Sequence, residues 1–259
     1  LEDCDGLYFS ESQITGTRGS GAIYARCSNQ PITVRESKFI DNTSGNSAWS
    51  MVVLLTDEIL EFSRNVVSGN VGSFAFNAPT SLISRNIFED NECYGSHDED
   101  FDYMWSGISV SGRSSGEVRF SRNLVRGSRC TLNLSISSAL VVSNNLLDAF
   151  PSRFLLTGQA NLNFSNNTVV SNAFASSEGI ESESPPSVRI RSGTNVRVSV
   201  SNNIFLSQEV GALGSLELGG LTRSSTLSNN FLSSAGGVWD INVNNFNQDP
   251  KLYDVEGRD

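Results

Sequence analysis

Val142-Ser143-Asn144-Asn145-Leu146 is one copy of a five-residue motif that occurs seven times in this chain of 259 residues. Each copy has an apolar residue, Ser, Arg or Asn, then Asn, and in six copies a second apolar residue follows. The other copies occupy residues 62–66, 83–87, 120–124, 164–168, 200–204 and 227–231. The shortest steps between copies are 21 and 22 residues. A repeat of this length, built from short alternating segments and turns, is typical of one coil of a solenoid.

The coil between Asn145 and Asn167 indicates how the repeat folds. Residues 146–147, 154–156 and 162–164 form short apolar or alternating segments, and breakers such as Pro151 and Gly158 separate them. Three short strands per coil predict parallel strands whose apolar side chains stack into a dry interior. We therefore expect one all-β domain, a right-handed parallel β-helix solenoid of about nine coils over residues 1–243, with a C-terminal tail at 244–259. At ~4.8 Å per coil, such a rod would be roughly 40 Å long.

The second Asn of each motif has a structural role in this interpretation. Asn tolerates the left-handed backbone conformation that a tight bend requires, and stacked copies can hydrogen-bond to one another along the axis. Before the first full motif, Gln13 and Lys38 occupy the equivalent position. We assign the stacked residues to an asparagine ladder and not to catalysis: Asn65, Asn86, Asn123, Asn145, Asn167, Asn203 and Asn230.

Composition restricts the partners. The chain has 18 Lys plus Arg against 28 Asp plus Glu, which gives a net charge of −10. This balance argues against nucleic acid, because phosphates require a basic surface. The longest plain apolar run, residues 51–55, is far too short to cross a bilayer. Because the chain begins at Leu1 within repeat-like sequence, we expect it to be a piece of a longer protein.

The four cysteines form two pairs at coil spacing. Cys93 and Cys130 each lie 7 residues after a ladder Asn, and Cys4 and Cys27 are 23 residues apart. Residues at equal offsets in successive coils stack on one another. The spacing favours two disulfides and an oxidising location, which is extracellular or on the cell surface. Stacked reduced thiols are the alternative.

The repeats at residues 7–243 resemble the pectin-lyase-like superfamily of right-handed parallel β-helices, in particular its generic right-handed β-helix regions. Residues 19–23 and the Phe-x-x-Asn segments 39–42 and 88–91 also resemble repeats of polymorphic outer membrane adhesins. Residues 245–252 resemble the segment that often follows the last coil in secreted bacterial β-helix proteins. These resemblances imply a secreted or surface protein whose partner is a polysaccharide or cell-surface glycan.

Two coils are oversized, with steps of 37 and 36 residues. Both insertions, residues 92–106 and 173–187, follow the strand after the ladder Asn and precede the next long strand. Insertions on one face of a solenoid tend to mark its binding face. We therefore expect a cleft between two loops, with a floor that includes the outward residues Ser109 and Asn133.

The first insertion contains the sole histidine, His97, within an acidic and aromatic segment. Alternating carboxylates could hold a hard cation such as Ca²⁺, the one candidate cofactor, and aromatic rings beside carboxylates suit sugars. The alternative is a solvated acidic loop anchored by buried Trp105 and Phe101. The catalytic candidates are His97, Asp98, Asp100, Asp102 and Tyr103, and the ligand-binding candidates here are Tyr94 and Trp105.

The strand after the second insertion alternates arginines at positions 189 and 191. Outward Arg189 and Arg191 could bind a sugar carboxylate, or they could neutralise neighbouring glutamates. Arg153, on the preceding long strand, is a further ligand-binding candidate. The resemblance to pectate-lyase-like enzymes implies that Arg153 or Arg189 could act as the base of a lyase.

The enzyme motifs of this fold are largely absent. The chain has neither the paired Asp residues nor the Gly-His-Gly of polygalacturonase-like hydrolases. Alginate epimerase-like proteins use Tyr, Asp and His close together, and Tyr94, His97 and Asp98 are of these types but do not follow the family's order. The sequence favours a glycan-binding or adhesive module of a secreted or surface protein. The alternatives are a polysaccharide lyase, epimerase or hydrolase that acts on an acidic polysaccharide, and a segment of a phage spike or fibre.

Overall fold

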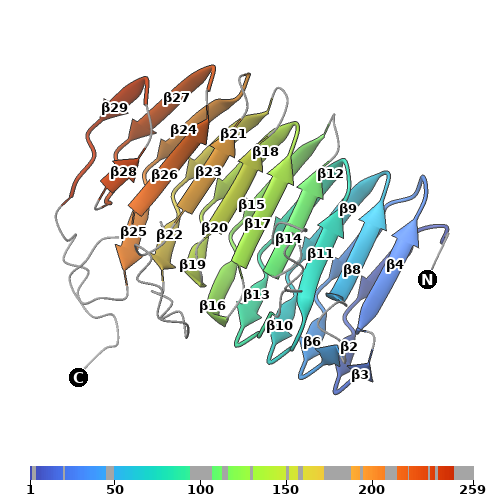
Figure 1. The fold of residues 1–259 in the computed structure, drawn as a ribbon. Coiled ribbons are helices and arrows are strands. Elements are labelled where there is room, and N and C mark those ends of the chain that lie inside the picture. The colour runs from blue at the N-terminus through green and yellow to red at the C-terminus, as the bar shows by residue number, and fades with distance from the viewer. Residues whose placement is uncertain are drawn as a thin grey trace, which may run out of the picture.

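The computed structural model describes residues 1, 4–19, 21–44, 50–93, 107–112, 116–128, 131–149, 152–156, 160–171, 188–192, 195–207, 215–220, 222–232, 234–236 and 239–247. Within these ranges the chain forms parallel strands and no helix, and it winds into a solenoid whose coils follow one another from the N-terminal end to the C-terminal end (Figure 1). The predicted all-β parallel solenoid is therefore confirmed. No described segment has the helical length and apolar character that a membrane-spanning helix needs.

Three long sheets line the solenoid. Sheet B has the order β1 (Leu7–Ser10), β5 (Ile32–Arg35), β9 (Ile59–Ser63), β12 (Thr80–Ser84), β15 (Glu117–Ser121), β18 (Ala139–Ser143), β21 (Asn161–Ser165), β24 (Arg197–Ser201), β27 (Ser224–Ser228) and β29 (Ile241–Val243). Sheet C has the order β2 (Gln13–Thr15), β6 (Lys38–Ile40), β10 (Val66–Ser68), β13 (Ile87–Glu89), β16 (Leu124–Ser128), β19 (Leu146–Ala149), β22 (Thr168–Ser171) and β25 (Ile204–Ser207). Sheet A has the order β28 (Ser234–Gly236), β26 (Ser215–Gly220), β23 (Val188–Ser192), β20 (Ser152–Leu156), β17 (Thr131–Ile136), β14 (Gly107–Gly112), β11 (Ser73–Asn77), β8 (Ser50–Thr56) and β4 (Ile23–Cys27).

The regular part of the solenoid is shorter than the sequence suggested. From β9 to β26 the strands visit sheets B, C and A in constant order, which gives about six regular turns instead of the expected nine. The two turns before β9 contain the extra short strands β3 (Arg18–Gly19) and β7 (Thr43–Ser44), which pair with each other. After β26, the described strands no longer include a member of sheet C. The repeat count therefore overestimated the number of complete three-strand turns.

The interior is a stack of apolar side chains. Phe39, Phe62 and Phe88 are fully buried, and their rings lie 6.0 and 6.2 Å apart in sequence order. Phe164 and Phe205 are stacked at 6.0 Å further along the axis. Fully burying one such side chain contributes about 1.5–3 kcal/mol. Because Phe62 lies on sheet B and Phe39 and Phe88 lie on sheet C, rings from the two sheets pack against one another and form a continuous core.

The asparagine ladder runs along the corner between sheets B and C. Each ladder Asn donates from its side chain to the Oδ1 atom of the next one: Asn86 donates to Asn123 at 3.0 Å, and Asn145 donates to Asn167 at 2.9 Å. The same Oδ1 atoms accept backbone N–H groups at 3.0 and 3.1 Å. The bonds connect Asn65, Asn86, Asn123, Asn145, Asn167, Asn203, Asn230 and Asn245. All of these residues except Asn245 are buried, so a ladder of structural asparagines is confirmed. Asn245 belongs to the ladder although it lies within the predicted C-terminal tail. The division of the chain at residue 243 stays a prediction.

Two details of the predicted corner were wrong. The left-handed residue is the one before each ladder Asn: Arg85 and Asn144 have φ of 59° and 57°. The Oδ1 atom of a ladder Asn instead accepts the backbone N–H of the ladder Asn in the preceding coil. The equivalents of the ladder Asn in the first coils are Ser12 and Ser37, and not Gln13 and Lys38. A Ser hydroxyl can accept the same backbone N–H, as Ser37 does from Ser12 at 3.2 Å.

A second, shorter ladder lies at the corner between sheets C and A. Asn42 donates from its side chain to Asn70 at 2.9 Å, and Asn70 donates to Asn91 at 2.9 Å. All three are buried. Phe39 and Phe88, three residues before Asn42 and Asn91, point into the core. The Phe-x-x-Asn segments therefore combine one core residue with one ladder residue, which gives them a structural explanation.

Candidate binding face

Four neighbouring strands of sheet A, β14, β17, β20 and β23, form the surface that the sequence predicted as a floor. β14 follows residues 94–106 and β23 follows residues 172–187, and both segments lie outside the described residues. The chain therefore re-enters the same sheet after each insertion, with β17 and β20 between the two entry points (Figure 1). The cleft between two loops itself remains a prediction.

Small polar side chains occupy the outward positions of β14 and β17. Ser109 is in register with Asn133, and Ser111 is in register with Ser135. All four are half-buried, whereas the alternate residues of both strands are buried in the core. The sequence indicated Ser109 and Asn133 but missed Ser111 and Ser135, which the two-residue period of a strand would have added.

The three arginines of this face have different environments. Arg153 lies in register between Asn133 and Arg189, and its side chain is outside the described part. Arg189 donates from Nε to Oε2 of Glu217 at 2.7 Å, which balances its charge within sheet A. Glu217 lies on β26, whereas the neutralising alternative concerned the glutamates of the insertion, which lie outside the described residues, so that alternative stays a prediction. Arg191 is exposed.

A shallow pocket of about 280 Å³ lies at the N-terminal end of the same sheet. Arg26, Leu55 and Asn77 are in one row along β4, β8 and β11, and this row continues through Ser111 to Ser135. The pocket therefore joins the polar floor on one face of the solenoid. Its lining residues are Arg26, Cys27, Ser28, Leu55, Thr56, Asp57 and Asn77. Sequence reasoning missed it, because its residues come from three separate coils.

The acidic and aromatic candidates cannot be placed on this face. Tyr94, His97, Asp98, Asp100, Asp102, Tyr103 and Trp105 all lie outside the described residues. Among the described residues, no three His, Cys, Asp or Glu side chains come together in a group that could hold a metal ion. The Ca²⁺ site and the catalytic assignments therefore stay predictions.

One predicted disulfide is present. Cys4 and Cys27 are bonded, with their Cα atoms 4.6 Å apart, so the spacing argument holds for this pair. Cys93 is also disulfide-bonded, but its predicted partner, Cys130, lies outside the described part of the chain.

No protein-family model, curated protein or solved structure matches the chain. The class that the structure defines is therefore a parallel β-solenoid, and membership of the pectin-lyase-like superfamily remains an expectation from resemblance.

Proposed function

We propose that this chain is a glycan-binding module of an extracellular or cell-surface protein, and that the glycan lies across the outward face of sheet A. The observation that carries this proposal is the block of small polar side chains on β14 and β17. Ser109, Ser111, Asn133 and Ser135 present hydroxyl and amide groups on neighbouring strands.

The spacing of these groups suits a chain of sugars. Neighbouring strands are ~4.8 Å apart, which is close to the length of one pyranose unit, so a glycan that runs along the axis meets a new polar pair at each coil. Small side chains also keep the surface flat, so that sugar hydroxyls can approach the strands directly. On β8 and β11 the positions in register with Ser109 are Val53 and Ala75, so the polar block begins at β14.

Charge at both ends of the face favours an acidic sugar. Arg26 lies in the pocket at one end, and Arg191 is exposed at the other. Arginine binds carboxylate groups with two parallel hydrogen bonds when the geometry allows. The proposed ligand class is therefore an acidic polysaccharide or surface glycan.

The extracellular or cell-surface location rests on the disulfides. The Cys4–Cys27 bond closes the first coil, and Cys93 is bonded as well. Such bonds form and persist in oxidising compartments and are rare in the cytosol.

The test is binding of pectin, alginate and glycosaminoglycans, measured by calorimetry with purified protein. The double variant Ser109→Ala/Asn133→Ala should weaken binding roughly tenfold, because it removes two polar groups of the face. The matched control is Asn163→Ala/Ser199→Ala, which removes the same pair of side chains in register on sheet B. Equal losses in both variants, or no binding of any polysaccharide by the wild-type protein, would overturn the proposal.

The same polysaccharides test the enzymatic alternative. Reducing sugars and absorbance at ~235 nm, the wavelength of the unsaturated product of a lyase, are followed with and without Ca²⁺. Turnover that His97→Ala or Asp100→Ala abolishes would replace the binding module with a lyase, epimerase or hydrolase. Saturable binding without turnover supports the module.

A further inference from the structure

The corner between sheets B and C carries one exposed left-handed residue per coil. In three successive coils this residue is an arginine: Arg64, Arg85 and Arg122, with φ of 57°, 59° and 58°. Their backbone N–H groups donate to Ser84, Ser121 and Ser143 in the following coils at 3.0, 3.1 and 3.0 Å. The three arginines therefore stack along the axis, ~4.8 Å apart.

Arginine is not the residue that this backbone favours. A left-handed conformation costs about 1–2 kcal/mol for most L-residues, whereas Asn visits it routinely. The later coils follow this preference, because Asn144, Asn166 and Asn202 occupy the same position with φ of 57°. Strained positions that persist are reasonable places to look for function. The two earlier coils have Glu11 and Glu36 at this position, with φ of 48° and 51°, so the corner also accepts charged residues. The conformation therefore does not select arginine, and the positive charge needs a reason other than the turn itself.

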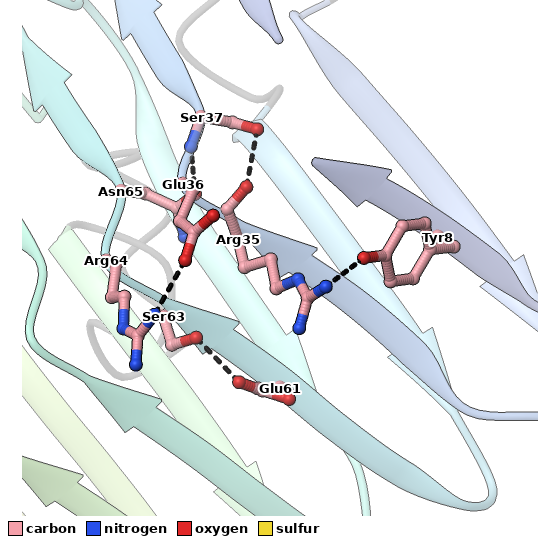
Figure 2. Close-up of polar contacts among 8 residues, drawn as sticks. All are labelled: Tyr8, Arg35, Glu36, Ser37, Glu61, Ser63, Arg64 and Asn65. Atoms are coloured by element: carbon pink, nitrogen blue, oxygen red, sulfur yellow. Dashed lines mark hydrogen bonds and ion pairs between the residues drawn. The ribbon is translucent and has the colours of Figure 1, made fainter. Parts of the chain in front are cut away.

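The charges of Arg85 and Arg122 are not balanced within the described part of the chain. Figure 2 shows that the preceding coil differs, since Arg64 pairs with Glu36 at 2.6 Å and the Ser63 hydroxyl donates to Glu61. Arg85 and Arg122 are exposed, and neither forms an ion pair with a described residue. Two adjacent guanidinium groups thus remain available in a chain of net charge −10.

These two arginines lie between polar residues on sheet B and apolar residues on sheet C. Ser84 and Ser121 precede them on sheet B, in register and half-buried. Ile87 and Leu124 lie on the other side, in register on sheet C, and Ile87 is 37% exposed. Each coil therefore presents a hydroxyl, a guanidinium and an apolar side chain in the same order.

We propose that this corner is a second binding site, separate from the face of sheet A, for a linear acidic polysaccharide that runs along the solenoid axis. Arg85 and Arg122 bind carboxylate or sulfate groups of successive sugars, the Ser hydroxyls bind sugar hydroxyls, and Ile87 and Leu124 pack against the apolar faces of the rings. One cation per ~4.8 Å suits a polymer with about one charge per sugar. Duplex DNA carries one charge per ~1.7 Å, and single strands are usually bound by stacking on aromatic rings, whereas the described neighbours of these arginines on sheets B and C are serine, isoleucine and leucine.

The test compares Arg85→Asn/Arg122→Asn with the wild-type protein, using polygalacturonate, heparin and dextran as probes at physiological ionic strength. Asn occupies the same corner in later coils, so the double variant retains the fold, which thermal unfolding verifies. The control is Arg119→Asn, an exposed arginine on sheet B that pairs with Glu117 at 2.7 Å. We expect roughly tenfold weaker binding of an acidic probe by the double variant and less than about twofold change in the control.

The two acidic probes distinguish carboxylated from sulfated ligands, and dextran should not bind at this corner. No binding of either acidic probe by the wild-type protein would overturn the proposal. So would equal losses in the double variant and the control, which would indicate only a general charge effect. Tighter binding of a single-stranded oligonucleotide, lost in the double variant, would reassign the site to nucleic acid. Because the face of sheet A is proposed to bind the same probes, the comparison is repeated in the Ser109→Ala/Asn133→Ala protein, in which the loss at the corner should persist.

Discussion

The corner between sheets B and C and the corner between sheets C and A follow different rules. From β9–β10 to β24–β25, the first corner always has two residues between its strands, such as 64–65 and 202–203. The second corner varies: residues 129–130 separate β16 from β17, whereas 90–106 separate β13 from β14 and 172–187 separate β22 from β23. One corner thus has fixed length, and the other accepts insertions.

The ladders explain this difference. The ladder at the first corner connects every coil from Asn65 to Asn245, and each link requires a left-handed residue followed by Asn. The ladder at the second corner links Asn42, Asn70 and Asn91, and the first insertion follows within a few residues. A continuous ladder fixes the register of the solenoid, so that the opposite corner can vary without loss of the stack. Each insertion is therefore followed by a strand of sheet A, the sheet that carries the proposed binding face.

The largest effect is expected from Asn123→Ala in the long ladder. The Asn123 side chain accepts two hydrogen bonds from Asn86, both 3.0 Å, and donates to Ile83 O at 3.0 Å and to Asn145 at 3.2 Å. Several buried polar groups would lose their partners, so the free energy of unfolding should fall by about 3–5 kcal/mol. Urea denaturation measures it, with the exposed Asn163→Ala as control. A loss below about 1 kcal/mol would show that the ladder is not essential.

Asn70→Ala should have a smaller and more local effect. Asn70 accepts from Asn42 at 2.9 Å and donates to Phe39 O at 2.8 Å, but its ladder extends over few coils. We expect a loss of about 2–3 kcal/mol, because solenoid coils can open from one end. Hydrogen exchange should show faster amide exchange in β2, β6 and β10 and unchanged protection from β15 to β24. Uniform loss of protection along the solenoid would contradict the proposed difference between the ladders.

Arg85→Asn should stabilise the fixed corner. Arg85 has φ of 59° and forms no ion pair with a described residue, and Asn adopts this conformation at lower cost. The expected gain is about 0.5–1 kcal/mol in the free energy of unfolding, measured by urea denaturation. Arg119→Asn, on a regular strand, should give no such gain. If Arg85→Asn destabilised the protein, the Arg85 side chain would have a stabilising partner in the fold, and its presence at the corner would not need a binding role.

The smallest effect concerns Asp148, which lies near the variable corner of its coil. It is in register with Val170 on sheet C, and burial raises the pKa of its carboxyl above the ordinary value of 3.8. The folded state therefore binds this proton more tightly than the unfolded state, and the stability from this group is lost as pH rises through the folded pKa. Asp148→Asn should therefore stabilise the protein slightly at pH 7, because solvent screens this half-buried carboxyl, and the gain should vanish below pH ~3.8. Thermal unfolding across this pH range measures it, and a gain that grows on acidification would contradict it.

Much of the fold could be predicted from the sequence, but the backbone conformation at the corner between sheets B and C could not be predicted in detail. The strands expected at residues 146–147, 154–156 and 162–164 are β19, β20 and β21, each longer by a few residues because pairing with neighbouring coils extends into the turns. The left-handed position was assigned one residue too late. Both residues of an Asn-Asn pair suit a turn, and an Arg-Asn pair favours the Asn, so only the structure shows that the first residue takes the positive φ.

The proposed binding sites were also predicted from the sequence only in part. Ser109 and Asn133 could be predicted because they lie on strands between the two insertions. The pocket around Arg26 and Asn77 and the exposed arginines Arg85 and Arg122 could be identified only from the structure, because their residues come from separate coils.

The sequence by itself determined that the chain is a parallel solenoid, because a motif repeated at coil spacing places identical residues in identical surroundings. It also predicted the buried asparagines, and its coil spacing favoured the Cys4–Cys27 pair. Only the tertiary structure decided that Arg26 and Asn77 share a face with Ser111 and Ser135, because residues 20 to 40 positions apart become neighbours solely through the register of the coils. It also decided which arginines are neutralised, since the carboxylates that pair with Arg64 and Arg189 come from neighbouring coils.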